Sequence, residues 1–331
     1  MIWNLLAMLL LIYRVAEPGY HFEFPRDHFN HPDFRTEWWY YTGNLHDAAG
    51  HRFGFELVFF REGEPGGENN RSAWAAKDIY LAHLALTDAA GRRFRYQQRL
   101  NRQGPGIAGV EPGRIWNGNW SSEWKGTTQT LRAIAPEFRF ELTTVSVTPP
   151  VLHGENGLSR KAEGPGRASY YVSLPRLRTT GQLTLSGKTF QVAGTAWMDH
   201  EWFTRQLAPE QTGWDWFSVQ LDDGTELMLF ELRRKDGAID SHSSGSFIAR
   251  DGTTTHLTHG DFTLQPTAWW QKYPIEWNIA VPSHQLRLHA KAVLANQELP
   301  QYWEGAVDYT GTQTGVGYLE MTGYTRPVEF R

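Results

Sequence analysis

The feature that most constrains this chain is a repeated alternation of apolar and polar residues. Apolar side chains recur at every second position in segments 53–59, 227–229 and 286–290. Because successive side chains of a β-strand point to opposite faces, a period of two indicates strands that bury one face. Helical patterns are sparse by comparison. The chain is therefore predicted to be all-β.

Short polar segments that contain Asp and Gly separate these apolar runs. They lie at residues 47–50, 88–91, 222–224, 236–237 and 251–252. Asp and Gly are the residues that tight hairpin turns require, so the strands they join are expected to be antiparallel. Many short strands in each half predict two closed or nearly closed antiparallel β-barrels, an arrangement that also removes exposed sheet edges.

A chain of 331 residues is long enough for two domains, each with its own core. Pro209 and its polar neighbours in segment 207–212 are typical of a linker. We therefore predict an N-terminal domain over residues 20–206 and a C-terminal domain over residues 207–331.

Residues 2–13 form an apolar run that matches the core of an export signal, although only Met1 precedes it. We interpret residues 1–19 as a truncated leader, with a buried first strand as the alternative. A leader would make the mature protein an exported one, located in the periplasm or associated with the envelope.

Composition and motif context exclude several classes of function. The net charge is -4 and the basic residues form no stripe, so nucleic acid is not an expected partner. The chain has no Cys, which excludes thiolate metal sites and Cys nucleophiles. His200-Glu201 lacks the second His of a zinc protease motif, because that position is Thr204. A Gly-rich match to a dinucleotide loop at 104–109 is followed by Pro112-Gly113, which forbids the required helix. No metal and no cofactor are expected.

Two segments concentrate Trp and ionisable side chains, 197–202 (WMDHEW) and 213–216 (GWDW). Large apolar rings around a carboxyl group disfavour its charged form, so its pKa rises and it becomes a candidate proton donor near neutral pH. In the alternative, the Trp side chains fill a core and the carboxylates cap turns or pair with Arg. The candidate catalytic residues are Asp199, His200, Glu201 and Asp215.

An extended backbone would divide the first of these segments between two faces. Asp199 and Glu201 would point to one side, and His200 and Trp202 to the other. Only one of these two pairs can enter a cavity.

The 15 Trp residues and their clustering with acids predict a deep pocket for a large apolar ligand. Segment 37–40 repeats the pattern of an acid beside aromatic residues. Tyr170 and Arg176 could orient an oxygen or a carboxylate of the ligand, or could simply belong to a strand with one exposed Arg. The candidate ligand-binding residues are Glu37, Trp38, Trp39, Tyr40, Tyr170, Arg176, Trp197, Trp202, Trp214 and Trp216.

Several long motifs occur in one order along the chain. They are 37–43 (EWWYYTG), His153-Gly154 with 157–161 (GLSRK), 169–171 (SYY), 175–177 (PRL), 197–202 and 213–216. In these motifs the chain resembles the AttH/CrtC family over nearly all of its length after residue 19. The resemblance implies two lipocalin-like barrels in tandem. Family members are described as carotenoid 1,2-hydratases or as predicted secreted hydrolases, and distant fungal relatives cyclise polyenes.

The resemblance also implies a chemistry. Hydrating an alkene needs an acid that protonates carbon, a surrounding that tolerates a carbocation, and one water molecule. A protonated carboxyl such as that of Asp215 would supply the proton, indole faces would stabilise the cation, and His200 would orient the water. The implied enzyme is a hydro-lyase, or a hydrolase, that acts on an isoprenoid or acyl ligand.

Two other functions fit the same residues. In a non-catalytic carrier of lipophilic molecules, the aromatic residues line the pocket and the acids hold its rim. A structural protein of the envelope would bind no ligand. The enzyme and the carrier would both have a lipophilic small molecule as their partner, and both allow contact with a membrane surface. The sequence leaves the oligomeric state open.

Overall fold

The computed structural model describes residues 13–64, 72, 77–104 and 106–329, and it confirms an all-β protein. The two described 3₁₀ helices, η1 (Arg26–His28) and η3 (Pro282–His284), are short. A first sheet contains β1 (Thr36–Asp47), β2 (Arg52–Gly63), β3 (Asp78–Asp88), β4 (Arg93–Arg102), β5 (Ala108–Glu111), β6 (Arg114–Asn117), β7 (Trp120–Lys125), β8 (Thr128–Ile134), β9 (Phe138–Ser146), β10 (Val151–Leu152), β11 (Leu158–Arg160), β12 (Ala168–Leu185) and β13 (Lys188–Phe203). A second sheet contains β14 (Gln211–Leu221), β15 (Glu226–Arg234), β16 (Ser244–Ile248), β17 (Thr254–Thr258), β18 (Thr263–Trp270), β19 (Tyr273–Val281), β20 (Leu286–Ala292), β21 (Trp303–Gly311) and β22 (Gly315–Met321).

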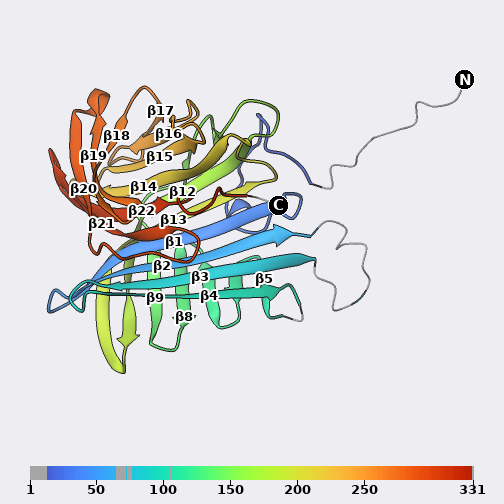
Figure 1. The fold of residues 1–331 in the computed structure, drawn as a ribbon. Coiled ribbons are helices and arrows are strands. Elements are labelled where there is room, and N and C mark those ends of the chain that lie inside the picture. Colours follow the sequence, from blue (N-terminus) through green and yellow to red (C-terminus); the bar gives the residue numbers. More distant parts are fainter. Residues whose placement is uncertain (1–12, 65–71, 73–76, 105, 330–331) are drawn as a thin grey trace, which may run out of the picture.

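Each sheet curls into a barrel-like shape (Figure 1). The strand order is β4-β3-β2-β1-β13-β12-β9-β8-β7-β6-β5 in the first sheet and β17-β16-β15-β14-β22-β21-β20-β19-β18 in the second. A bridge between Gln103 and Ala108 brings β4 close to β5, the two ends of the first sheet. This architecture confirms the prediction of two tandem lipocalin-like barrels.

The hairpin turns lie where the Asp and Gly segments predicted them. Between β1 and β2, the Asp47 carboxylate accepts hydrogen bonds from the backbone N–H groups of Ala49 (2.8 Å) and His51 (2.9 Å). Gly50 follows with a φ of 80°, a conformation that residues with a Cβ rarely adopt. Side-chain capping by Asp and a left-handed Gly thus close this turn.

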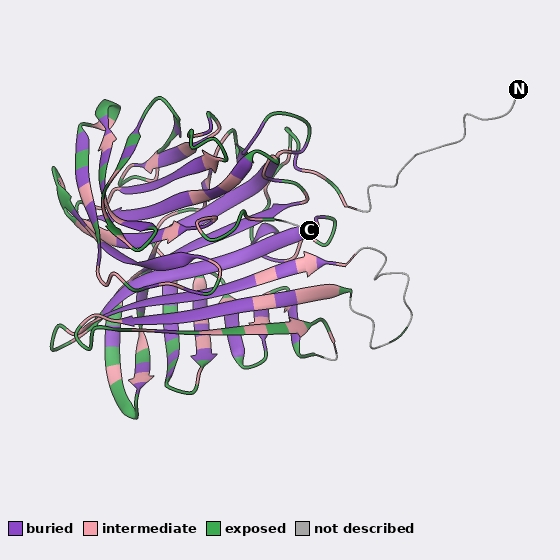
Figure 2. Cartoon of the chain, viewed as in Figure 1, coloured by how far each residue is buried: buried purple, intermediate pink, exposed green. Residues whose placement is uncertain are grey.

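Apolar side chains fill the interior of each barrel. The alternating residues of segment 53–59 belong to the core of the first barrel, and those of 286–290 belong to the core of the second. A third apolar cluster lies between the barrels, where β1 and β2 contact β22 and β21. Figure 2 shows that the strands at this junction are largely buried. Because both barrel interiors are packed, this interface is the place to look for a ligand.

The two sheets divide between β13 and β14, where the chain crosses from one barrel to the other. Residues 1–12 of the expected leader lie outside the described residues. Its last residues pack on the first barrel: Ala16 is buried, and the Glu17 N–H donates to the Tyr170 hydroxyl (3.1 Å). No helix among the described residues has the length and apolar character needed to cross a membrane.

Candidate functional site

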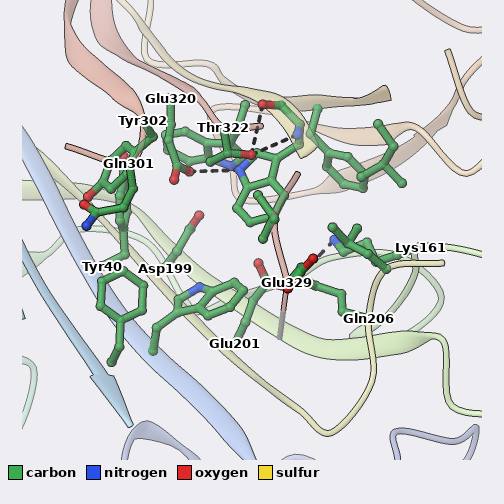
Figure 3. Close-up of a pocket in the computed structure, with 18 of the residues that line it drawn as sticks. Tyr40, Lys161, Asp199, Glu201, Gln206, Gln301, Tyr302, Glu320, Thr322 and Glu329 are labelled. Carbon is green, nitrogen blue, oxygen red and sulfur yellow. Dashed lines mark hydrogen bonds and ion pairs between the residues drawn. The ribbon is translucent and has the colours of Figure 1, made fainter. Parts of the chain in front are cut away.

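A cavity of about 780 Å³ lies between the two barrels (Figure 3). Strands of the first barrel form one side of it and strands of the second form the other, and residues 326–329 cover part of it. The first barrel contributes Trp38, Tyr40, Phe60, Leu81, His83, Lys161, Tyr171, Asp199 and Glu201. The crossing segment and the second barrel contribute Gln206, Leu207, Trp214, Trp216, Phe230, Leu232, Gln301, Tyr302, Glu320 and Thr322.

The pairing of β13 with β1 decides which side chains reach the cavity. Asp199 lies opposite Tyr40, and Glu201 lies opposite Trp38. These four side chains line the cavity, whereas His200 and Trp202, at the alternate positions, do not. The structure therefore shows the two-sided arrangement that an extended segment requires.

Asp199 is buried and accepts three hydrogen bonds. The Tyr171 hydroxyl donates to Oδ2, and the Ser173 hydroxyl and the Trp197 indole N–H (2.5 Å) donate to Oδ1. Burial raises the pKa of Asp199 to about 7, although these donors act to lower it. Asp199 is thus poised to gain or lose a proton near neutral pH.

Glu201 lies beside Asp199 in a more cationic environment. Its carboxylate accepts hydrogen bonds from the Ser169 hydroxyl and from Gln206 (3.2 Å), and lies 3.8 Å from Lys161 Nζ. Burial raises the pKa of Glu201, and burial lowers that of Lys161. The Lys161 ammonium also lies 4.0 Å from the centroid of the Phe230 ring, a cation–π distance.

Glu320, on β22, faces Asp199 from the second barrel, and Figure 3 shows the two carboxyl groups pointing toward one another. Its carboxyl accepts one hydrogen bond, from the Trp214 indole N–H (3.0 Å). Burial, helped by the nearby carboxylates of Glu56, Glu201 and Asp199, raises its pKa to about 8, although the Trp214 hydrogen bond acts to lower it. Glu320 is therefore protonated at neutral pH.

A second carboxyl pair joins the barrels beside the cavity. Glu56 of β2 accepts a hydrogen bond from Tyr302 (2.9 Å), and Glu304 of β21 accepts one from Tyr40. His83 Nδ1 lies 2.6 Å from the Tyr302 hydroxyl. Burial raises the pKa of Glu56 to about 7 and that of Glu304 well above its usual range. The charge of Glu56 adds to the rise of the Glu304 pKa, so the two carboxyls do not readily ionise together.

The opposite face of β13 carries a different kind of cluster. Glu37 Oε1 lies 2.7 Å from His31 Nδ1 and 2.8 Å from His200 Nε2, and its Oε2 accepts from Arg61 Nε (3.2 Å). Burial acts to raise the pKa of Glu37, but His31, His200 and Arg61 outweigh it and hold the pKa well below its usual range. Glu37 is therefore an ionised, fully paired carboxylate.

This cluster is also a place where a metal ion could bind among the described residues. One ligand atom each from His31, Glu37 and His200 lie within 4.8 Å of one another. The ring nitrogens already lie at hydrogen-bond distance from Glu37, and Arg61 occupies its second oxygen. Protons and a guanidinium thus occupy the positions that a metal ion would need.

The remaining predicted site residues lie outside the lining of the cavity. Asp215 points away from it and forms an ion pair with Arg233 (2.5 Å). Arg176 pairs with Glu226 and donates to the Leu221 carbonyl (2.8 Å). Residues Trp39, Tyr170, Trp197 and Trp202 are buried in apolar clusters, and Glu37 and His200 belong to the paired cluster.

Sequence reasoning did not select several polar residues that line or adjoin the cavity, among them Glu56, Lys161, Tyr302, Glu304 and Glu320. Segment 302–304 (YWE) has the same combination of an acid and aromatic residues as 37–40, and that was the available signal. Nothing in the local sequence distinguishes Glu320 from an acid at a strand end.

These features define a class: a two-barrel protein with an aromatic, acid-lined ligand cavity at the junction of its barrels. The AttH-like family model matches residues 15–324, so the chain belongs to the AttH-like family. The crystal structure of an AttH protein from Nitrosomonas europaea is 33% identical over 94% of this chain and 99% of that one, with a TM-score of 0.86.

Two more distant structures share the fold. Kievitone hydratase from Nectria haematococca is 14% identical, with 86% of this chain and 88% of that chain covered and a TM-score of 0.67. CghA, solved with Sch210972, is 14% identical, with coverage of 88% and 89% and a TM-score of 0.57. No curated protein matches the chain.

Proposed function

We propose that this protein binds a lipophilic ligand between its barrels and reversibly adds water to a C=C bond of that ligand. The observation that carries the proposal is the pair of carboxyls, buried Asp199 and half-buried Glu320, that face one aromatic cavity from opposite barrels. Their pKa values, about 7 and about 8, bracket the range in which one holds a proton while the other is ionised.

The proposed hydration divides the work between these two groups. Protonated Glu320 donates its proton to an alkene carbon, and the resulting carbocation is stabilised by the indole faces of Trp214 and Trp216. Asp199 accepts a proton from the water molecule that attacks the cation. The C=C bond becomes a C–H and a C–OH bond, and one proton remains on Asp199 in place of the one that left Glu320.

The environment of the cavity suits a large apolar substrate. Its aromatic lining and its volume of about 780 Å³ favour an extended isoprenoid, polyene or acyl chain. The fold shared with kievitone hydratase supports the assignment to a hydro-lyase at the level of architecture. We assign the two catalytic roles to Glu320 and Asp199, because Asp215 and His200 lie outside the cavity lining.

The experiment starts with the ligand. Lipids that copurify with the protein are extracted, identified by mass spectrometry and returned to the protein in water labelled with heavy oxygen. Wild-type protein is expected to yield a product that carries one labelled oxygen. Glu320→Gln and Asp199→Asn should each lower the rate by about 100-fold to 10,000-fold, the usual contribution of a general acid or base.

Asp215→Asn is the matched control, because Asp215 is as buried as Asp199 but does not line the cavity. It should retain the wild-type rate. Binding of the same lipid without incorporation of labelled oxygen in the wild type would instead identify a carrier. Absence of any bound lipid would overturn both functions.

The setting we propose is the cell envelope, as an exported protein that meets its lipophilic ligand near a membrane surface. The apolar run at residues 2–13 supports it. Fractionation of the native host, with mass spectrometry of the N-terminus, tests this directly. Recovery in the cytoplasmic fraction with residues 1–19 intact would contradict it.

A further inference from the structure

A row of buried, hydrogen-bonded side chains extends from Asp199 away from the cavity. Ser173 donates to Asp199 Oδ1, and His153 Nε2 lies 2.6 Å from the Ser173 hydroxyl. On the other side of the ring, His153 Nδ1 lies 2.8 Å from the Ser246 hydroxyl. Ser173, His153 and Ser246 are all fully buried. The row crosses from β12 of the first barrel to β16 of the second.

The single proton of each hydroxyl fixes the direction of these hydrogen bonds. Because Ser173 gives its proton to Asp199, its oxygen must accept one from His153 Nε2. The Nδ1 atom of a neutral His153 then accepts from Ser246. Burial, together with the charges of Lys161 and His256, lowers the pKa of His153 to about 3, so the ring is neutral at physiological pH.

The far end of the row approaches the surface at His256. In the antiparallel pair of β16 and β17, His256 lies directly opposite Ser246. Directly opposed side chains of an antiparallel pair lie on the same face of the sheet. His256 is exposed, and its charge reaches His153. An exposed imidazole therefore stands beside the outer end of the buried row.

We propose that Ser173, His153 and Ser246 form a proton relay that exchanges the proton of Asp199 with His256 and solvent. The relay deepens the proposed function and depends on it for its use in turnover. Bound ligand would fill the cavity and separate Asp199 from bulk solvent on that side, apart from the one reacting water molecule. The relay supplies a second route for proton exchange between Asp199 and solvent, on the side of the carboxyl group away from the cavity.

The relay has two end states that differ by one proton. With Asp199 ionised, hydrogen bonds run from Ser246 through His153 and Ser173 to Asp199. When the Ser246, His153 Nε2 and Ser173 protons each move one step toward Asp199, the carboxylate becomes a carboxyl group and His153 becomes the Nδ1–H tautomer. Ser246 regains a proton from His256 or water. The reverse steps release the proton that Asp199 takes from the attacking water.

Other charged and titratable groups around His153 do not replace any member of the row. Tyr171 packs on the ring with centroids 4.4 Å apart, and its hydroxyl donates to the other oxygen of Asp199. Lys161 lies near enough to influence the charge of His153, but its ammonium donates to Ser159. The two serines are therefore the hydrogen-bonding partners of this imidazole.

Nitrogen NMR of the ligand-free protein, with labelled His, tests the relay without any substrate. His153 is expected to remain neutral and to change from the Nδ1–H to the Nε2–H tautomer as Asp199 ionises. The midpoint should lie near the pKa of Asp199, about 7. Asp199→Asn and Ser173→Ala should both abolish this change. A tautomer that stays constant across the titration of Asp199 would overturn the relay.

Ser169→Ala is the matched control. Ser169 is a buried serine of the same strand that donates to the neighbouring Glu201 and not to Asp199. The His153 tautomer should still follow pH in this variant, and its loss there would show a general disturbance of the fold. The two proposals are separable: a tautomer switch without water addition retains the relay and removes the proposed function. Water addition whose rate and pH profile are unchanged in Ser173→Ala removes the relay alone.

Discussion

The carboxyl groups on the two sides of strand β13 lie in opposite electrostatic environments. On the cavity face, the Asp199 carboxyl group points toward that of Glu320, and burial raises the pKa of both. On the other face, His200 contacts Glu37, whose pKa is held well below its usual range. Asp199 and Glu37 are buried, and Glu320 is half-buried.

Glu37 and Glu320 differ in whether a cation lies beside the carboxyl group. Glu37 has Arg61, His31 and His200 around it, whereas Glu320 has a neutral indole N–H and further carboxyls. Burial alone disfavours charge, but a close opposite charge reverses that effect. Glu37 is therefore ionised beside Arg61, whereas Glu320, with no cation among its hydrogen-bond partners, keeps its proton. The predictions below test this contrast, from the largest effect to the smallest.

Removing the cation should destabilise the paired face most. Arg61→Met leaves Glu37 and Asp78 without their buried partner, which should cost about 3–5 kcal/mol in the free energy of unfolding. Urea denaturation measures it. The control is Arg132→Met, which removes an exposed arginine paired with Glu123 and Glu141 and should cost less than about 1 kcal/mol. Equal losses would contradict the contrast.

The contribution of Glu320 to the free energy of unfolding should fall as the pH rises. Folded Glu320 retains its proton up to a pH of about 8, whereas its usual pKa is 4.5. Its contribution to stability is therefore fully present below the lower value and is lost as the pH rises toward the higher one. Glu320→Gln should remove a pH-dependent loss on the order of 3 kcal/mol.

Denaturation of both proteins at a series of pH values measures this effect. Glu37→Gln serves as the comparison. Because Glu37 is ionised in the folded protein, this substitution should leave the fall in stability with rising pH in place. A wild-type protein that gains stability over this range, with Glu320→Gln unchanged, would contradict a protonated Glu320.

A single donor should tune the cavity carboxyl. The Tyr171 hydroxyl donates to Asp199 and in turn accepts from the Trp216 indole (2.9 Å). Because this bond favours the ionised form, Tyr171→Phe should raise the pKa of Asp199 above about 7 by roughly one unit. Infrared titration against Asp199→Asn detects the change. A lowered pKa of Asp199 would show that the Tyr171 hydroxyl does not favour the ionised carboxylate.

The smallest effect is expected from metal removal. Hydrogen bonds and Arg61 already satisfy Glu37, so treatment with EDTA should leave the melting temperature of the purified protein unchanged. A clear fall in melting temperature that zinc reverses, and that is lost in His31→Ala, would instead show a metal ion between His31, Glu37 and His200.

Local patterns were enough to predict the strands, the hairpin turns and the two faces of segment 197–202. These depend on backbone period and turn chemistry within a few residues. The same reasoning selected Asp199 and Glu201, which line the cavity, together with Asp215, which does not.

The partners of the cavity carboxyls were beyond such reasoning. Glu320 meets Asp199 because β22 packs against β1, a contact between residues far apart in sequence. Likewise, Arg61 neutralises Glu37 through the pairing of β1 with β2. The charge state of each acid therefore depends on strand pairing and barrel packing that no local motif contains.

Infrared difference spectroscopy of wild type, Glu320→Gln and Glu37→Gln is the most direct test of the central claim. At neutral pH the protonated-carboxyl band of the wild type should contain a component that disappears with a midpoint near pH 8 and is absent from Glu320→Gln, beside the contributions of other protonated carboxyls such as Glu304. Glu37→Gln should retain this component. A spectrum in which Glu320 is already ionised at neutral pH, or in which this component depends on Glu37, would contradict the account.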